Sequence, residues 1–520
     1  MLSSALFLDR DGTLIEDVGY LSDIEDIHFI PGIFDILKRL QKRYSLFVVS
    51  NQIGIAKGLI SHAQVDRVNR HIDSVFQQQG IHIQQWFVCP HDRQAECSCR
   101  KPEPGFLLKA ADEHKLNFGS SFVIGDHPHD PATAEAVGAF GLYVLTGHGM
   151  KHLKELPQEQ LVFHNLPAAG EWVLEHPNPK ADLQAEVARG AAALQAGKLT
   201  VFPTETVYGL GADALNPDAV AMIFEAKQRP LHDPLIVHVA SIKQVTALTD
   251  HLSEKAVHLM ETFWPGPLTL VLPKSNQVPD IVTAGNHTVA IRMPANPLAL
   301  QLIRTAGVPV AAPSANLFGR TSPTTAGHVK SQLSGSYAAL IDGGTCRVGV
   351  ESTVLSLTTE TPVILREGGL AREDIEEAIG TVLSHEEEGV TKYDGPGMLP
   401  DHYAPTTPLR LVDDIEQYMG SPRVGKLYFQ NRPQKQSNSQ RQSSQQKQSF
   451  PQAADEAVRI LSPRGDVREA AINLYHRMQE LDAMELDLIV AEFAPNHGLG
   501  RAVNDRLKKA SQKGIAPGAI

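Results

Sequence analysis

The stretch from Leu199 to Val239 decides the fold of the second half of the chain. It reads LTVFPTETVYGLGADALNPDAVAMIFEAKQRPLHDPLIVHV. Apolar strands are expected at Leu199–Phe202 and Leu235–Val239, and a helix between them ends near Lys227 and Arg229. Strand ends that bring glycine, hydroxyl and cationic side chains into one crevice are typical of anion sites in α/β sheets. The stretch therefore predicts an α/β domain with an anion-binding site.

Later segments add further hydroxyl, amide and guanidinium groups at expected strand ends and turns. Any one of them alone would be an ordinary surface turn. Together they place four cations in one candidate site of a chain whose net charge is −12, and clustered cations with Ser and Asn donors suit a nucleoside triphosphate. No Walker A loop accounts for such a site. The segments are Phe263–Thr269, Thr288–Pro294, Ala311–Asn316, Val348–Thr353 and Ile364–Gly369, and the cations are Lys227, Arg229, Arg292 and Arg366.

This constellation resembles the YrdC-like threonylcarbamoyl-AMP synthases over about residues 181–375, with Lys227/Arg229 and Ser314/Asn316 as the matching signature. The resemblance implies a YrdC-like α/β domain with a twisted open sheet. It also implies the conversion of L-threonine, bicarbonate and ATP to L-threonylcarbamoyl-AMP and pyrophosphate, towards threonylcarbamoyladenosine in tRNA. The implied threonine contacts are Thr204, His238, Arg292 and Ser352. The implied ATP contacts are Lys227, Arg229, Thr288, Ser314, Asn316, Ser322 and Arg366.

The end of the chain resembles the longer, two-domain members of that family. The segment 395–405, GPGMLPDHYAP, is similar to their linker across the active site, where His402 or Tyr403 would touch ATP. A Pro-rich connector without a functional role is the alternative. Beyond it we expect a small Rossmann-like domain at 409–520 whose Gln/Ser-rich insertion 430–452 cannot bury a core and is predicted to be disordered.

The first 165 residues alternate strand and helix patterns, which predicts a parallel sheet with helices on its faces. Asp9 and Asp11, two residues apart with Gly12 following, come directly after an apolar strand. Such a pair can supply a nucleophile and a general acid/base around a metal, although an isolated pair is more often a solvated turn. Later strand ends favour the functional interpretation because they add Ser50-Asn51, Arg100-Lys101 and Asp126 with Asp130.

These four motifs resemble those of the haloacid dehalogenase-superfamily phosphatases, nearest to the heptose bisphosphate and histidinol phosphatases, and so imply a Rossmann-like phosphatase domain. The resemblance implies that Asp9 attacks phosphorus and that Asp11 acts as acid and then base. Lys101 and Ser50 would hold the phosphoryl oxygens. Mg²⁺ would bind Asp9, the Asp11 carbonyl and Asp126. The remaining substrate contacts would be Asp17, Tyr20, Asn51 and Arg100. His127 departs from the family pattern, which often has Lys there.

A compact loop carries Cys89, His91, Cys97 and Cys99, three of the chain's four cysteines. Thiolate and imidazole ligands at this spacing suit a closed tetrahedral Zn²⁺ site with a structural role. The cysteine usage, the lack of a signal peptide and the absence of an apolar run of about 18 residues indicate a cytoplasmic protein without a membrane span. The acidic balance offers no broad surface for stable DNA binding.

We therefore expect an α/β multidomain enzyme with a phosphatase domain at 1–170, a linker at 171–182, a synthase domain at 183–390, an active-site linker at 391–408 and the small domain at 409–520. Its partners would be ATP, L-threonine, bicarbonate, a sugar bisphosphate and the downstream tRNA threonylcarbamoyl-transferase machinery. D-glycero-D-manno-heptose 1,7-bisphosphate is favoured over histidinol phosphate as the phosphatase substrate. For the second half the alternative is an RNA-binding module without synthesis, and for the first half an inactive zinc-stapled scaffold.

Overall fold

The computed structural model describes residues 3–388, 395, 402–431 and 457–512. The chain divides into two compact units, Met1–Ala185 and Glu186–Ile520. Most of the predicted linker 391–408 and nearly all of the predicted insertion 430–452 lie outside the described residues. None of the helices in the described ranges is long and apolar enough to cross a membrane.

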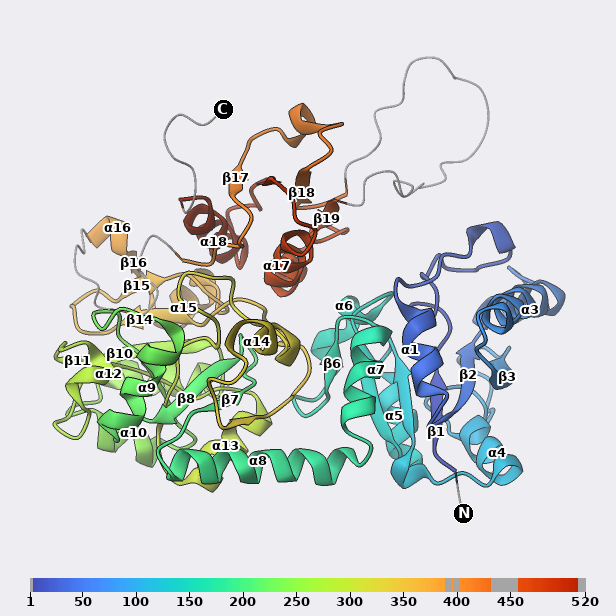
Figure 1. Ribbon diagram of the computed structural model, residues 1–520, viewed down its shortest axis with the longest axis horizontal. Helices are drawn as coiled ribbons and strands as arrows, with labels where there is room; N and C mark the ends of the chain where they lie inside the picture. Colours follow the sequence, from blue (N-terminus) through green and yellow to red (C-terminus); the bar gives the residue numbers. More distant parts are fainter. Residues whose placement is uncertain (1–2, 389–394, 396–401, 432–456, 513–520) are drawn as a thin grey trace. The chain divides into compact units, whose positions relative to one another are not determined.

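The described strands of the first unit form a six-stranded sheet in which every neighbouring pair is parallel (Figure 1). The order β3-β2-β1-β4-β5-β6 makes β1 the point where the chain changes its winding direction, so a crevice is expected at the carboxyl end of β1. The strands are β1 (Ala5–Leu8), β2 (Ser45–Asn51), β3 (Ile83–Cys89), β4 (Phe122–Gly125), β5 (Phe140–Val144) and β6 (Val162–Phe163).

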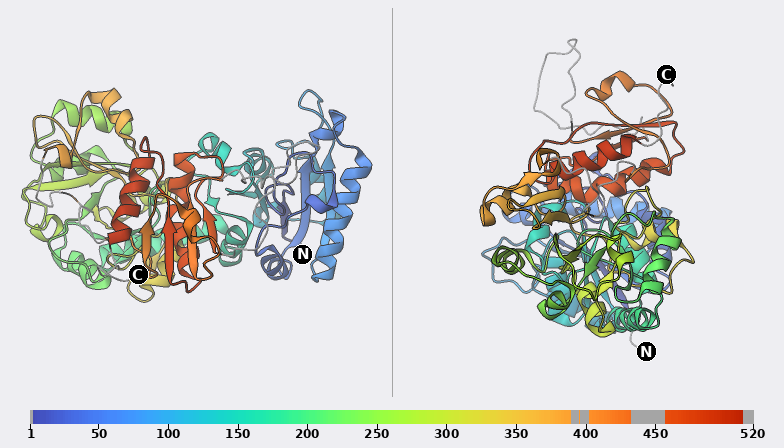
Figure 2. Two further views of the ribbon diagram at one scale, coloured as in Figure 1. Left: turned by 90° about the horizontal axis from the view of Figure 1, so that it is seen from above. Right: turned by 90° about the vertical axis from the view of Figure 1, so that its left-hand side faces the viewer.

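Alternate residues of these strands supply two separate cores, because successive side chains point to opposite faces of a sheet. Leu6 and Leu8 pack with side chains of α1, α3 and α7, whereas Phe7 packs with side chains of α4 and α5. Helices therefore cover both faces of the sheet (Figure 2). The helices are α1 (Ile33–Leu40), α2 (Ile53–Ala56), α3 (His62–Gln78), α4 (Gly105–His114), α5 (His129–Val137), α6 (Gly149–His152) and α7 (Leu166–Glu175).

The predicted linker 171–182 is largely helical, which differs from the irregular segment that its two prolines suggested. It covers the end of α7 and the start of α8 (Pro179–Gln195), with residues 176–178 between them. Pro179 is the first residue of α8. A backbone N–H at this position would have no acceptor within the helix, so a proline there costs the helix no hydrogen bond. The compact units separate inside α8, at residues 185/186.

The described strands of the second unit include a ten-stranded mixed sheet of order β13-β7-β8-β12-β9-β11-β10-β14-β15-β16. Its strands are β7 (Thr200–Phe202), β8 (Gly209–Asp213), β9 (Ile236–His238), β10 (Leu268–Pro273), β11 (Thr288–Arg292), β12 (Val310–Ala311), β13 (Ala339–Leu340), β14 (Thr353–Ser356), β15 (Val363–Arg366) and β16 (Leu383–Ser384). The helices around it are α9 (Pro217–Lys227), α10 (Ile242–Leu248), α11 (Glu254–Phe263), α12 (Asp280–Thr283), α13 (Pro297–Ala306), α14 (Ala326–Leu333), α15 (Arg372–Ile379) and α16 (His385–Glu388).

The end of the second unit has a four-stranded parallel sheet among its described residues, in the order β17-β20-β18-β19. Its α17 and α18 share a hydrophobic core with Val207, Val350 and Tyr403 of the preceding region. The small sheet is thus packed onto the larger one through its helices rather than tethered loosely. Its elements are β17 (Leu409–Leu411), β18 (Val424–Tyr428), β19 (Val458–Ile460), β20 (Leu488–Ala491), α17 (Val467–Asp482) and α18 (Gly500–Gln512).

Candidate active sites

The candidate phosphatase site lies at the carboxyl ends of β1 and β4, where the winding direction changes. Lys101 Nζ lies 2.7 Å from Asp9 Oδ1 and 2.6 Å from Asp130 Oδ1. All three side chains are largely buried, and the neighbouring carboxylates raise the pKa of Lys101 against the opposing effect of its burial. The lysine therefore stays charged beside the proposed nucleophile. Asp130 was predicted to follow the same strand as Asp126, but no role was assigned to it.

Three carboxylates of this crevice could share a cation, because ligand oxygens of Asp9, Asp126 and Asp130 lie within 4.8 Å of one another. Burial, reinforced by the charges of Asp130 and Asp11, raises the pKa of Asp9 to about 7 despite the opposing charge of Lys101. Burial also raises the pKa of Asp126 well above its ordinary value. Buried carboxylate oxygens that repel one another are the donor set that a hard divalent cation would neutralise, so these residues fit Mg²⁺.

Two glycines allow the loops to approach Asp126 closely. A β-carbon on Gly12 or Gly147 would lie 2.1 Å from Asp126 Oδ2, and both residues have positive φ. The backbone N–H of His148 donates a hydrogen bond to the same oxygen at 2.7 Å. Asp17 also reaches this side of the site, where its carboxylate lies 3.2 Å from His148 Nδ1.

Asp11 is held by residues that the sequence motifs did not single out. The fully buried guanidinium of Arg10 donates to both carboxylate oxygens at 2.9 Å, and Gln52 Nε2 donates to Oδ2 at 2.7 Å. Ser50 Oγ lies 3.5 Å from that oxygen and accepts a hydrogen bond from Gln52. This geometry fixes the orientation of the proposed acid/base beside the nucleophile. The signal that could have found Gln52 is its place directly after the Ser50-Asn51 strand end.

The remaining predicted substrate contacts occupy more peripheral places. The side-chain amide of Asn51 donates to the carbonyl of Lys101 at 3.2 Å and accepts from its N–H at 3.1 Å. Asn51 therefore positions Lys101. Tyr20 is exposed and accepts a hydrogen bond from Lys57 Nζ at 3.1 Å. Arg100 donates to the carbonyl of His91 at 3.2 Å, which ties it to the cysteine loop.

The cysteine loop brings its four predicted ligands together, with ligand atoms of Cys89, His91, Cys97 and Cys99 within 4.8 Å of one another. The Cys89 sulfur lies 3.4 Å from that of Cys99 and 3.8 Å from that of Cys97, and His91 Nδ1 lies 3.3 Å from the Cys99 sulfur. At these separations one zinc ion could bind all four ligand atoms, as a tetrahedral site requires. The arrangement fits zinc.

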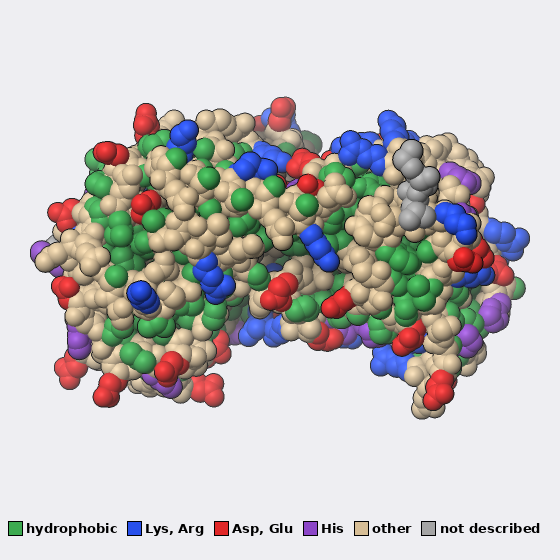
Figure 3. All heavy atoms as spheres, turned by 90° about the horizontal axis from the view of Figure 1, so that it is seen from below, with side chains coloured by type: hydrophobic (Ala, Val, Ile, Leu, Met, Phe, Trp, Pro, Cys, Tyr) green, Lys and Arg blue, Asp and Glu red, His purple; other side chains and the backbone are tan. Residues whose placement is uncertain are grey.

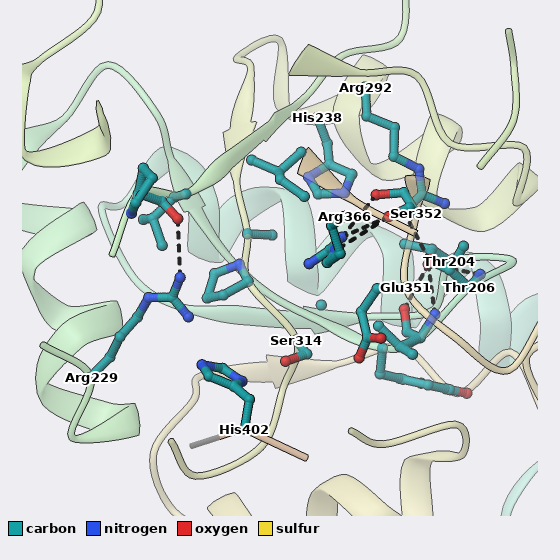
Figure 4. A pocket seen from close by; sticks show the side chains of 18 of the residues that line it. Thr204, Thr206, Arg229, His238, Arg292, Ser314, Glu351, Ser352, Arg366 and His402 are labelled. Atoms are coloured by element: carbon teal, nitrogen blue, oxygen red, sulfur yellow. Dashed lines mark hydrogen bonds between the residues drawn. The ribbon is translucent and has the colours of Figure 1, made fainter. Parts of the chain in front are cut away.

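The second candidate site is a pocket at the strand ends of the ten-stranded sheet (Figure 4). His238 ends β9 and Arg292 ends β11, and the two are register partners on parallel strands. In the close view, Arg292, Thr204 and Thr206 lie on one side of the pocket, and Arg229 and His402 on the other. Other predicted contacts lining it are Ser314, Ser352, Arg366 and Tyr403.

The end of α9 positions the two cations of the opening stretch. Gln228 adopts a left-handed conformation (φ +54°) that ends the helix after Lys227. Lys227 is buried, and its Nζ donates to the carbonyls of Ser314 and Asn316, so in this conformation it holds that loop in place. Burial and then the charge of Arg229 lower the pKa of Lys227 well below its ordinary value. Lys227 does not itself line the pocket, whereas Arg229 does.

Buried ion pairs fix the guanidinium groups that line the pocket. Arg229 Nη2 lies 2.8 Å from Asp233 Oδ2, and Arg292 Nη2 lies 2.5 Å from Glu205 Oε1. Arg292 also donates to Thr206 Oγ1 at 2.8 Å. Because buried pairs of this kind keep their geometry, the pocket presents pre-oriented cations. Glu205 and Asp233 were not predicted, and no feature of the sequence beyond their nearness to predicted residues marks them.

His238 faces the pocket as a neutral side chain. Burial and then the charge of Arg292 lower its pKa to about 3. Its Nδ1 has no hydrogen-bond partner among the residues that the structure describes, which leaves a buried polar atom for a ligand to satisfy.

Ser352 and Arg366 form the centre of the pocket in the close view (Figure 4). Arg366 Nη2 donates to the Ser352 carbonyl at 2.9 Å and to its Oγ at 3.2 Å. Asn316 and Ser322 are not among the residues that line the pocket, although Ser322 donates to Glu351, which lines it. Thr288 is at the opposite end of β11 from Arg292, so the structure does not bring it to this pocket.

Comparisons with known proteins find relatives for both units. Residues 192–368 match the Sua5/YciO/YrdC family model, described as telomere recombination, and residues 370–512 match the C-terminal domain of threonylcarbamoyl-AMP synthase. Residues 98–169 match a model described as HAD-hydrolase-like.

Individual relatives cover each half of the chain. The threonylcarbamoyl-AMP synthase of Bacillus subtilis (strain 168) is 44% identical over 340 residues, covering 63% of this chain and 93% of that protein. The crystal structure of Pyrococcus abyssi Sua5 complexed with L-threonine is 41% identical with a TM-score of 0.55, and the match covers 63% of this chain and 94% of that one. The D-glycero-beta-D-manno-heptose-1,7-bisphosphate 7-phosphatase of Salmonella typhi is 34% identical over 191 residues, covering 35% of this chain and 94% of that protein. The second part of the chain therefore belongs to the threonylcarbamoyl-AMP synthase family, and the first part belongs to the heptose bisphosphate phosphatase family.

Proposed function

We propose that the chain is a bifunctional enzyme that makes L-threonylcarbamoyl-AMP from L-threonine, bicarbonate and ATP, and also hydrolyses a sugar phosphate. The observation that carries the synthase half is the single pocket that joins Arg292 and His238 to Arg229 and Arg366. Threonine as its carbamate would lie on the Arg292 side, where Thr204 and Thr206 offer hydroxyl groups. The ATP phosphates would lie towards Arg229, Arg366 and His402.

The synthase reaction needs orientation and charge stabilisation more than a covalent nucleophile. A carbamate oxygen attacks the α-phosphorus of ATP, the bond to the bridging oxygen breaks, and pyrophosphate leaves with the electron pair. Arg229 and Arg366 would stabilise the charge that develops on the phosphate oxygens. Lys227 supports them by holding the Ser314–Asn316 loop. The product would pass to the tRNA threonylcarbamoyl-transferase machinery.

Pyrophosphate release tests the synthase assignment directly. We expect release from ATP only when both threonine and bicarbonate are present, together with a product of the mass of L-threonylcarbamoyl-AMP. Tight RNA binding without pyrophosphate release would instead support the RNA-binding module.

The phosphatase half is carried by the Asp9–Lys101–Asp130 ion-paired cluster beside Asp11. Asp9 attacks phosphorus, the bond to the sugar oxygen breaks, and Asp11 donates the proton to that oxygen. Asp11 then takes a proton from water, whose oxygen displaces Asp9 and releases inorganic phosphate. Mg²⁺ held by Asp9, Asp126 and the Asp11 carbonyl would neutralise charge at the phosphoryl group. Lys101 orients Asp9 and favours its ionised form.

D-glycero-D-manno-heptose 1,7-bisphosphate is the substrate that we propose, because the named relatives act on it. Asp17, which contacts His148, and the Tyr20 loop would form the mouth of the site. The zinc loop would shape that mouth through the Arg100–His91 contact. Parallel assays of phosphate release from the heptose bisphosphate and from histidinol phosphate decide between the two substrates. Turnover of histidinol phosphate alone would reverse the assignment. With reduced thiols in the cysteine loop, we place the enzyme in the cytoplasm.

A further inference from the structure

A buried polar network joins the synthase pocket to the helices of the C-terminal region. Its centre is Glu351, which lines the pocket and is 5% exposed. Its carboxylate accepts hydrogen bonds from Ser322 Oγ, from Arg506 Nε at 2.8 Å and from the hydroxyl of Tyr475 at 3.1 Å. Tyr475 belongs to α17 and Arg506 to α18. Two of these donors therefore come from the C-terminal region.

Arg506 touches a second pocket-lining residue as well. Its guanidinium lies over the ring of Tyr403, with its centre 5.0 Å from the ring centroid. It also donates from Nη1 to the Glu367 carbonyl at 2.6 Å and to Asp505 at 2.7 Å. The Arg506 side chain is 0% exposed, so these contacts fix its conformation. One residue outside the pocket thus fixes both Glu351 and Tyr403.

The backbone at Tyr403 needs such support. Tyr403 has φ +68°, a left-handed conformation that is unfavourable for a residue with a β-carbon and persists only where packing imposes it. Besides Arg506, the ring contacts Tyr475 at a centroid distance of 6.1 Å and Lys509 at 5.9 Å. All three contacts come from α17 and α18. Contacts from these helices therefore support the conformation of Tyr403.

The loop that carries Glu351 also lies directly against α17. A β-carbon on Gly349 would be 2.3 Å from the Cα of Ile472 and 2.4 Å from the carbonyl oxygen of Ala471, and its φ is +80°. Only glycine permits this approach of backbone to backbone. A shift of α17 or α18 would consequently move the pocket wall at Glu351.

The pair at the centre of the network stays ionised over the physiological range. Burial alone would raise the pKa of Glu351, but the charges of Arg506 and Arg366 and the hydrogen bond from Ser322 bring it to about 2. Burial opposes the charge of Arg506, but Glu351, Tyr403 and Asp505 raise its pKa well above the ordinary value. A buried ion pair contributes more to a defined geometry than to stability. This suits a residue, such as Arg506, that positions its neighbours.

We propose that Arg506 is a positioning residue of the synthase reaction, which fixes Glu351 in the pocket wall and holds Tyr403, an implied ATP contact, in its left-handed conformation. The proposal rests on the proposed synthase function. It makes the C-terminal region part of the catalytic unit, although Arg506 does not line the pocket itself. The threonine side, with Arg292 and Thr204, has no contact with Arg506.

Steady-state kinetics of the full-length enzyme test this, with Arg506→Met as the main variant. We expect its KM for ATP to rise about tenfold or more and its kcat to fall, while threonine affinity measured by calorimetry changes by less than about threefold. Arg506→Lys should recover part of the loss because it keeps the charge. Arg501→Met is the matched control: Arg501 is also on α18 and pairs with Glu373 at 2.8 Å, away from the pocket. Its kinetics should stay close to those of the unchanged protein.

Because Arg506→Met leaves Glu351 buried without its partner and could impair folding, Tyr475→Phe provides a milder second variant. It removes only the hydroxyl that contacts Glu351, so we expect a smaller rise of KM for ATP in the same direction. Equal effects of Arg506→Met and Arg501→Met, or a parallel loss of threonine and ATP affinity, would overturn the positioning role. Absence of threonine-dependent pyrophosphate release in the unchanged protein would instead overturn the proposed function.

Discussion

At the scale of single residues, the phosphatase site depends on one buried lysine between two carboxylates. Lys101 is bound to Asp9 and Asp130, and its backbone is anchored by Asn51. The charge has two effects: it favours the ionised form of Asp9, and it would stabilise the negative charge of the transferring phosphoryl group.

Replacing Lys101 with Met should therefore lower phosphate release by about 100-fold or more, since a preorganised charge at a phosphoryl group is lost. Pyrophosphate release by the synthase, measured on the same sample, serves as the internal control and should not change. A loss of phosphatase activity below about tenfold would show that Lys101 has no such role.

The neutral His238 predicts a pH dependence of stability. Its pKa is about 3 in the folded protein against an ordinary value of 6.5. Between these values the unfolded chain binds a proton that the folded protein does not, so the free energy of unfolding falls as the pH drops from 6.5 towards 3. One such group contributes at most about 1.4 kcal/mol per pH unit. Denaturant titrations of His238→Gln should show a correspondingly shallower decline over this window, and an unchanged slope would contradict the assignment.

At the scale of secondary structure, the sequence predicted which strand ends carry polar groups better than which side chains share a pocket. The helix end near Lys227 and Arg229 was predicted from the sequence, and the structure has it. Thr288 and Arg292 belong to one strand, but four residues span about 13 Å, so only one of them can reach the pocket. Partners such as Gln52 and Glu351 were missed because long-range packing, rather than any local motif, brings them to the site.

The cysteine loop is the element whose role can be tested by removing its metal. We expect about one zinc per chain by mass spectrometry of metals, and none in Cys99→Ser, because a tetrahedral site loses most of its affinity with one ligand. Since Arg100 is tied to His91 in this loop, the variant should raise the KM of the phosphatase more than it lowers kcat.

Cys346→Ala is the control for that experiment, because Cys346 is buried in the other unit and belongs to no ligand cluster among the described residues. It should keep the zinc. Zinc retained by Cys99→Ser would show that the loop does not bind the metal in the proposed way.

At the scale of the whole molecule, the two compact units have separate hydrophobic cores, so each contains what it needs to fold. Phe122 lies in a core built from residues of Met1–Ala185, and Leu302 in one built from Glu186–Ile520. The predicted boundary at 171–182 came from proline content and missed the helices there, because a proline at a helix start leaves the helix intact.

Differential scanning calorimetry of the full-length chain should accordingly resolve two unfolding transitions that respond to different substitutions. Phe122→Ala removes a fully buried ring and should cost its unit about 3–5 kcal/mol, and Leu302→Ala should cost the other unit about 2–5 kcal/mol. Each should lower only its own transition, by about 10 °C for the first unit and about 5 °C for the larger second unit. Each variant should also keep the activity of the unaffected unit at a temperature below both transitions. If either substitution shifts both transitions together, the units fold as one cooperative body, and the separate cores do not define independent domains.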